Sequence, residues 1–206
     1  SDVTLVPFVG GKPQMAVRKP VVYLYPEVPT DVVVRVEPDG PLTAVYPALQ
    51  DGAWSVRAHP DGRLVQGDRT HRYLFWESEA PAFDLDPADA HLVAREHAVG
   101  FLETLCDRNG LEDTVCGDLV TYWLPELQAH PYTLVAFPGE AYTRWAPLTV
   151  EPRPDAVVRL YFVLQGLEEP VRVGSPPLPS ADPSGFTVVE WGGSSLPPQA
   201  SGRSRP

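Results

Sequence analysis

Asp-Gly pairs divide the first third of the chain at three places: Asp39-Gly40, Asp51-Gly52 and Asp61-Gly62. Gly after Asp supplies the positive φ that a tight hairpin turn needs. The segments between these pairs alternate apolar and polar residues, most clearly at 32–36 and 54–58. Such alternation is the period of a half-buried strand. A turn signal every ten to twelve residues therefore predicts antiparallel β-structure over residues 30–77.

Further strand patterns lie before and after this region. In KPVVYLYP (residues 19–26), prolines bracket a run of high strand propensity, as expected at strand boundaries. Residues 157–164 are apolar at nearly every position, which predicts a central strand covered on both faces. The other predicted strands are residues 71–77, 132–137, 147–152, 171–173 and 185–191.

A helical period interrupts the strands at about residues 87–127. Asp86 before Pro87 resembles a capped helix start, although Leu92 and Val93 fit a short strand equally well, with the helix beginning near Glu96. Asn109-Gly110 predicts the end of the first helix, and the second is expected at 111–122, before Pro125. The residues expected to face inward are Val99, Leu102, Leu105, Cys106, Val115, Leu119 and Trp123.

Together these patterns predict a mainly β fold of the α+β class. We expect a β-sandwich-like, antiparallel domain with one dry interior, on which the two helices rest as an appendage. The predicted organisation is an N-terminal extension (1–18), a single β-rich domain (19–191) and a disordered tail (192–206) that is rich in Gly, Ser and Pro.

Charge and hydropathy limit the classes of partner. The formal net charge is −11, from 27 acidic and 16 basic residues. This excess opposes binding to phosphate backbones, so we expect no nucleic-acid partner. No run approaches the roughly 18 apolar residues that span a bilayer, so we expect no membrane span.

Cys106 and Cys116 lie ten residues apart within the helical region. A disulfide between them would agree with an oxidising compartment, whereas two buried thiols in a cytosolic protein would look the same in sequence. We expect the disulfide, and with it an extracytoplasmic or secreted protein. A cytoplasmic location stays open.

Four blocks together resemble one family: KPVVYLYP (19–26), YLFWE (73–77), TYWLP (121–125) and GFTVVEWGG (185–193). The chain is similar over about residues 19–193 to an uncharacterised bacterial family, often of exported proteins, that ends in a similar VEWGG. The resemblance brings no established activity and assigns no catalytic residue. The cysteine pair is not part of the family's pattern.

Acidic side chains offer two candidate sites. Glu77 follows Trp76 and Glu190 precedes Trp191, and carboxylates beside tryptophans fit a glycan-acting hydrolase. The two carboxyl groups would then lie about 5 to 5.5 Å apart for a retaining enzyme or about 6.5 to 9.5 Å apart for an inverting one. The alternative is that both are structural. Asp84, Asp86 and Asp89 offer oxygen ligands to Ca²⁺, but they lack the spacing of an EF-hand loop, and a helix cap explains them as well.

Aromatic residues offer a binding surface. Core filling explains the tryptophans and tyrosines most simply. The functional alternative is an exposed rim that binds a glycan or an extended peptide, formed by Trp76, Tyr142, Arg144, Trp145 and Trp191, with Arg144 and Trp145 as its preferred exposed element. The histidines lack metal-ligand spacing, and no cofactor is expected. The sequence favours a non-enzymatic, extracytoplasmic or envelope-associated binding module, and the hydrolase using Glu77 and Glu190 is the alternative.

Overall fold

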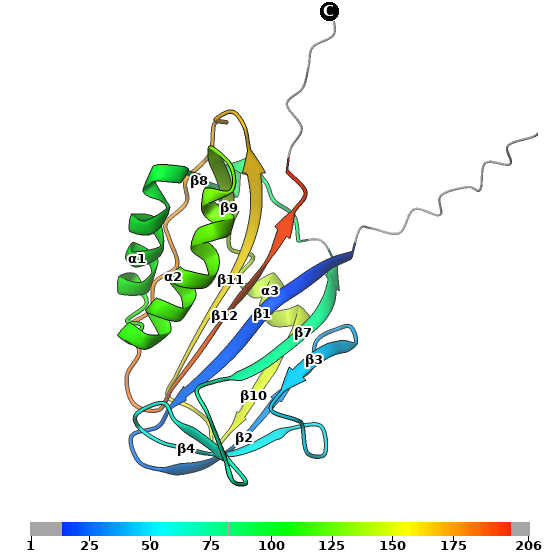
Figure 1. Ribbon diagram of the computed structural model, residues 1–206, viewed down its shortest axis with the longest axis vertical. Coiled ribbons are helices and arrows are strands. Elements are labelled where there is room, and N and C mark those ends of the chain that lie inside the picture. The colour runs from blue at the N-terminus through cyan, green and yellow to red at the C-terminus, as the bar shows by residue number, and fades with distance from the viewer. Residues whose placement is uncertain (1–13, 82, 199–206) are drawn as a thin grey trace, which may run out of the picture.

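The computed structural model describes residues 14–81 and 83–198, and these residues form two β-sheets and a layer of helices (Figure 1). The larger sheet has seven strands in the order β3 (Leu42–Tyr46), β7 (Leu74–Pro81), β1 (Gln14–Tyr25), β12 (Thr187–Leu196), β11 (Ala156–Leu167), β9 (Tyr132–Ala136) and β8 (Ala90–Ala94). The smaller sheet has five strands in the order β10 (Leu148–Glu151), β2 (Thr30–Val36), β4 (Trp54–Ala58), β5 (Leu64–Gln66) and β6 (Arg69–His71).

Helices α1 (Ala98–Arg108) and α2 (Asp113–Gln128) lie side by side on one face of the larger sheet (Figure 1). The short helix α3 (Glu140–Trp145) lies between β9 and β10 in the chain. Two 3₁₀ turns, η1 (Pro87–Asp89) and η2 (Arg95–His97), flank β8. Within the described residues, every helix is too short or too polar to cross a membrane.

The larger sheet is the middle layer and separates two hydrophobic cores. In β1, Val22 and Leu24 face the smaller sheet, whereas Val21 and Tyr23 face the helices, because successive side chains point to opposite faces of a strand. The Tyr23 hydroxyl reaches Asp118 of α2 at 2.9 Å, so the ring is buried while its polar end has a partner. The mainly β, α+β fold is confirmed, but the expectation of one dry interior with the helices as an appendage is wrong.

Strand β11 confirms the prediction of a central strand buried on both faces. Tyr161 and Val163 belong to the core between the sheets, and Leu160 and Phe162 belong to the core under the helices. Its neighbour β12 runs parallel to it, which departs from the expected antiparallel order. Adjacent parallel strands need a long connection. Here residues 168–186, which we call the crossover segment, supply it.

The Asp-Gly pairs predicted a positive-φ turn correctly at two of three positions. Asp51 and Gly52 both have positive φ, and Gly62 has a φ of 82°. Gly40 has no positive φ. Instead, a Cβ at Gly40 would lie 2.7 Å from the carbonyl oxygen of Glu79, so this Gly allows a close approach to β7 and does not form the predicted turn.

The helical region differs from its prediction in three places. Residues 90–94 form strand β8, as the alternative reading allowed, and the first α-helix starts only at Ala98. Val99 is 40% exposed, whereas the other six residues expected to face inward are buried. Helix α2 continues through Pro125 to Gln128, although proline donates no backbone hydrogen bond inside a helix. Leu127 in this last turn is fully buried.

Four boundaries also need correction. Residues 71–77 are split between β6 and β7, which belong to different sheets. Residues 171–173 form no strand, because they belong to the crossover segment. Strand β1 begins at Gln14 and β12 continues to Leu196, so pairing with neighbouring strands orders part of the predicted extension and tail. The rest of both, residues 1–13 and 199–206, lies outside the described residues, and the single-domain division stays a prediction.

The two glycines of the VEWGG block allow close packing. A Cβ at Gly192 would lie 2.8 Å from the Cα of Pro20 in β1. A Cβ at Gly193 would lie 2.7 Å from Cη2 of Trp123, a residue of α2, and 2.7 Å from the carbonyl oxygen of Phe162. Both glycines therefore leave room for a neighbour, since neither has a positive φ.

Gly193→Ala should lower the free energy of unfolding by about 1 to 3 kcal/mol, because the added methyl group overpacks the contact with Trp123. Gly100→Ala is the matched control: a Cβ there meets nothing within 4 Å, and alanine favours a helix by up to ~1 kcal/mol. Urea denaturation of the two variants checks this. Equal effects of both substitutions would show that the helix layer is not packed closely at Gly193.

Candidate functional site

Glu190 lies inside the core between the sheets and is 1% exposed. Its Oε2 accepts a hydrogen bond of 2.6 Å from Nε of Arg159, its partner on the adjacent strand β11, and its Oε1 accepts one of 3.1 Å from Nε1 of Trp76. Arg159 also donates to the carbonyl oxygen of Ala146 at 2.8 Å. The carboxylate is thus part of a buried, paired network, which is the usual condition for a charge in a core.

Aromatic rings surround this ion pair. The guanidinium carbon of Arg159 lies 4.7 Å from the ring centroid of Tyr142, which stacks on Tyr161 at 4.1 Å. Trp76 stacks on Trp145 at 6.2 Å. Burial and the charge of Glu190 raise the pKa of Tyr142 well above its ordinary value, so its hydroxyl stays protonated.

The alternative of an exposed aromatic rim is therefore wrong, and the rings fill the core. Trp76 and Trp191 are fully buried, and Tyr142 and Trp145 are also buried. Arg144 is exposed, but it pairs with Glu140 one turn earlier in α3. The rings serve as core filling because burying a large aromatic side chain contributes more than leaving it in water.

Glu77 and Glu190 do not form a carboxylate pair. Trp76 packs in the core between the sheets, on the face where Glu190 lies. Glu77 follows Trp76 in β7, so it points to the opposite face, where its Oε1 accepts a hydrogen bond of 3.3 Å from the backbone N–H of Lys19. The sheet lies between the two carboxylates, so they do not form the pair that the hydrolase alternative requires.

Asp84, Asp86 and Asp89 do not gather into a metal site. Asp86 is the N-cap of η1 and accepts a hydrogen bond of 2.8 Å from the N–H of Ala88, so the capping alternative is confirmed for this residue. Within residues 14–81 and 83–198, no three His, Cys, Asp or Glu side chains form a group that could hold a metal ion. The calcium alternative has no support from this geometry.

Lys19 lies among three aromatic rings at a bulge in β1. Its φ is 47°, and the register of β1 shifts here against both neighbouring strands. Its Nζ lies 5.5 Å, 5.0 Å and 5.9 Å from the ring centroids of Tyr73, Tyr122 and Trp191. The protein's own ammonium group fills this cation–π cage, so Trp191 serves an internal contact.

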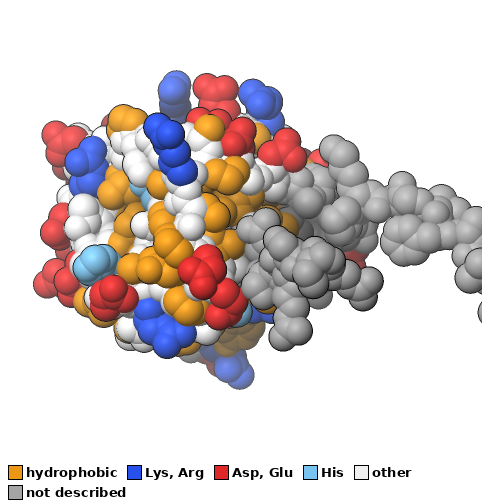
Figure 2. Space-filling model, turned by 90° about the horizontal axis from the view of Figure 1, so that it is seen from above, with side chains coloured by type: hydrophobic (Ala, Val, Ile, Leu, Met, Phe, Trp, Pro, Cys, Tyr) orange, Lys and Arg blue, Asp and Glu red, His pale blue; other side chains and the backbone are white. Residues whose placement is uncertain are grey.

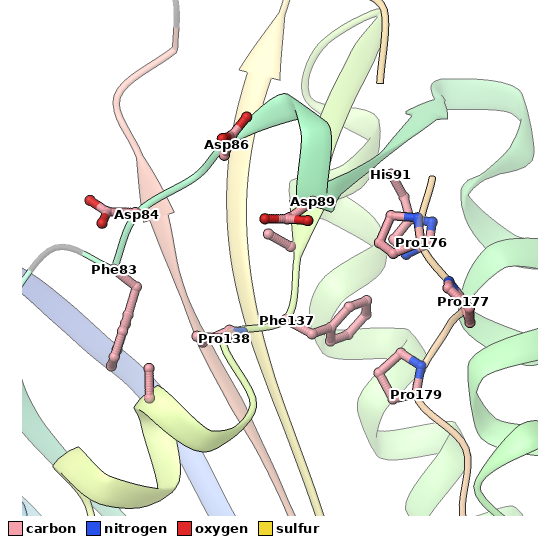
Figure 3. Close-up of a pocket in the computed structure, with 12 residues that line it drawn as sticks. Phe83, Asp84, Asp86, Asp89, His91, Phe137, Pro138, Pro176, Pro177 and Pro179 are labelled. Atoms are coloured by element: carbon pink, nitrogen blue, oxygen red, sulfur yellow. The ribbon is translucent and has the colours of Figure 1, made fainter. Parts of the chain in front are cut away.

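A groove opens at the β8 end of the larger sheet, and Figure 3 shows its lining. Its volume is about 630 Å³. We call it the proline groove. Its lining residues are Phe83, Asp84, Asp86, Asp89, His91, Ala136, Phe137, Pro138, Ala141, Pro176, Pro177 and Pro179. They come from three parts of the chain: residues 83–91, which lead into β8, residues 136–141, from the end of β9 to the start of α3, and residues 176–179 of the crossover segment.

The crossover segment is held against the helices where the disulfide lies. The Nδ2 of Asn109, at the end of α1, donates to the carbonyl oxygen of Pro179 at 3.0 Å. The N–H of Ala181 donates to the carbonyl oxygen of Arg108 at 3.0 Å. The disulfide joins Cys106 of α1 to Cys116 of α2, with their Cα atoms 5.7 Å apart. The expected disulfide is thus present, and it braces the helical turn that anchors the proline-bearing wall of the groove.

Of this groove, only the acidic part is a candidate site from the sequence alone. Asp84, Asp86 and Asp89 were considered as metal ligands, whereas the lining rings of Phe83 and Phe137 were not considered. The closely spaced prolines of residues 176–179 could have pointed to an apolar binding surface. Their position could not be inferred, because it depends on the route that the crossover segment takes between β11 and β12.

The surface seen from above has charges of both signs. Figure 2 shows hydrophobic side chains gathered in the middle of this end of the molecule, with acidic and basic side chains projecting around them. On this face the basic side chains are dispersed and form no continuous basic field of the kind that binds phosphate backbones.

Comparison with known proteins shows a partial similarity to a bacterial protein. Over 63 residues the chain is 40% identical to a protein of Butyrivibrio fibrisolvens described as "Uncharacterized protein in bglA 3'region". The match covers 30% of this chain and 66% of that protein, so the chain spans slightly less than two thirds of its relative. No family model and no solved structure matches the chain. The relative is itself an uncharacterised bacterial protein, consistent with the resemblance noted from the sequence blocks, and it brings no activity.

Glu190→Gln should lower the free energy of unfolding by about 3 to 5 kcal/mol, because it leaves the buried Arg159 guanidinium without its counter-charge. Glu77→Gln is the control and should cost at most about 1 kcal/mol, since Glu77 only accepts one long hydrogen bond at the sheet surface. Urea denaturation measures both. An unchanged stability of Glu190→Gln would contradict the structural role of this carboxylate.

Proposed function

We propose that the protein is a non-enzymatic binding module, and that the proline groove is its binding surface. The groove carries the proposal because it is open to solvent and combines an apolar lining with exposed carboxylates. Its volume of about 630 Å³ lies within the usual range of about 300 to 1,000 Å³ for ligand sites. Glu190 and the aromatic residues Trp76, Tyr142, Trp145 and Trp191 are instead buried, so they do not form a competing binding surface.

We propose further that the module works outside the cytoplasm, in a secreted or envelope-associated form. The disulfide between Cys106 and Cys116 supports this, because disulfides persist mainly in oxidising compartments. Fractionation of the source cells should recover the protein outside the cytoplasmic membrane with both cysteines oxidised. Recovery in the cytosol with free thiols would contradict the proposed location.

Filling the groove should abolish binding. Ala141 is an exposed small residue of the lining, so Ala141→Trp places an indole in the space a ligand would occupy. Ala48→Trp, at an exposed position outside the groove, is the matched control. Both variants and the wild type would be compared on a displayed library of random peptides and on a glycan array.

The wild type and Ala48→Trp should retain the same ligands, and Ala141→Trp should bind them at least about 10-fold more weakly, the loss expected when a central contact is blocked. Thermal unfolding should confirm that Ala141→Trp is folded. Full binding by this variant, or no ligand for the wild type on either library, would overturn the proposal.

A further inference from the structure

The proline groove has an uncompensated negative charge. Asp84, Asp86 and Asp89 are exposed, and within the described residues none of them forms an ion pair. The lining contains no Lys or Arg. Its only other titratable side chain is His91, which packs against the rings of Phe101 and Phe137. Burial lowers the pKa of His91 from 6.5, so at pH 7 it is neutral and does not offset the carboxylates.

The remaining lining is apolar. The ring of Phe137 lies between Pro138 and the prolines of the crossover segment in Figure 3, and Asp89 lies over the same space. Phe83 closes the groove toward the core, where it meets Tyr142 and Tyr161 edge-on. A ligand that covers these rings removes apolar surface from water, and a positive charge on it can meet the acidic rim.

We propose that the groove binds an extended peptide segment in which a Lys or Arg stands beside apolar or proline residues. This inference rests on the proposed function and names its ligand. Extended, proline-containing chains dock into aromatic-lined grooves at little entropic cost, because their backbone is already ordered. A polyamine would complement the negative charge of the groove, but it would leave the phenylalanine and proline side chains of the lining exposed to water. A glycan would find no exposed indole here, since all five Trp residues are buried.

A displayed library of random eight-residue peptides is the probe, because it presents basic, neutral and acidic ligands together. Selection on the disulfide-intact, full-length protein should enrich peptides that carry Lys or Arg next to apolar residues or Pro. Raising the salt concentration should weaken the selected peptides, since their charges meet exposed carboxylates. Enrichment of neutral or acidic peptides would overturn the inference.

One selected peptide would then be titrated against two variants that change the net charge equally, from −11 to −8. Asp84→Asn/Asp86→Asn/Asp89→Asn removes the acidic rim and keeps a side chain able to cap η1. Glu27→Gln/Asp51→Asn/Asp68→Asn removes three exposed carboxylates outside the groove lining. The first should weaken binding roughly 10-fold, because the basic side chain of the peptide loses the exposed carboxylates that it faces, and the second should leave it nearly unchanged.

The Ala141→Trp variant separates the two levels of the proposal. If it blocks the selected peptide while the two charge variants bind equally well, the groove is the binding surface but its ligand is not chosen by charge, and the inference is wrong. If Ala141→Trp leaves binding intact, the groove itself is not the site, and the proposed function fails with it.

Discussion

The structure depends on the two-sided burial of one parallel strand pair. Strands β11 and β12 lie at the middle of the larger sheet, and their side chains alternate between two cores. Val188 and Tyr161 pack toward the smaller sheet, whereas Val189 and Leu160 pack under the helices. The smaller sheet and the helix pair therefore share a common support, and each gains its hydrophobic burial against that support.

A charged pair sits inside this apolar support. Arg159 and Glu190 are partners in the register of β11 against β12, and both are shielded from water. A buried ion pair contributes little net stability, because desolvation costs about as much as the attraction returns. A shift of one strand by one residue would leave both charges unpaired in a core. The pair is thus better understood as fixing the parallel register than as adding stability.

Local chemistry was readable from the sequence, whereas long-range pairing was not. The turns at Asp51-Gly52 and Gly62 and the strand at 157–164 depend on a few neighbouring residues, so their patterns predicted them. The parallel pairing of β11 with β12 depends on the route of nineteen intervening residues, 168–186, which no local pattern encodes. Glu77 and Glu190 looked alike because both adjoin a Trp. Only the strand pairing shows that they lie on opposite faces of the sheet.

The candidate site has the same origin. Its acidic residues could be selected from the sequence, but the proline-bearing wall reaches them only because the crossover segment must return from one end of β11 to the start of β12. On the way, it is held to the last turn of α1 beside the disulfide. The groove is therefore a consequence of the parallel pair at the centre of the fold.

Native-state hydrogen exchange measures this dependence most directly. If the parallel pair supports both layers, the backbone amides of residues 158–163 in β11 and those in the middle of α2 should exchange only through global unfolding, with the free energy obtained from urea denaturation. Exchange of the α2 amides through an opening several kcal/mol below that value, with β11 still protected, would show that the helix layer is an independent appendage and would contradict the account.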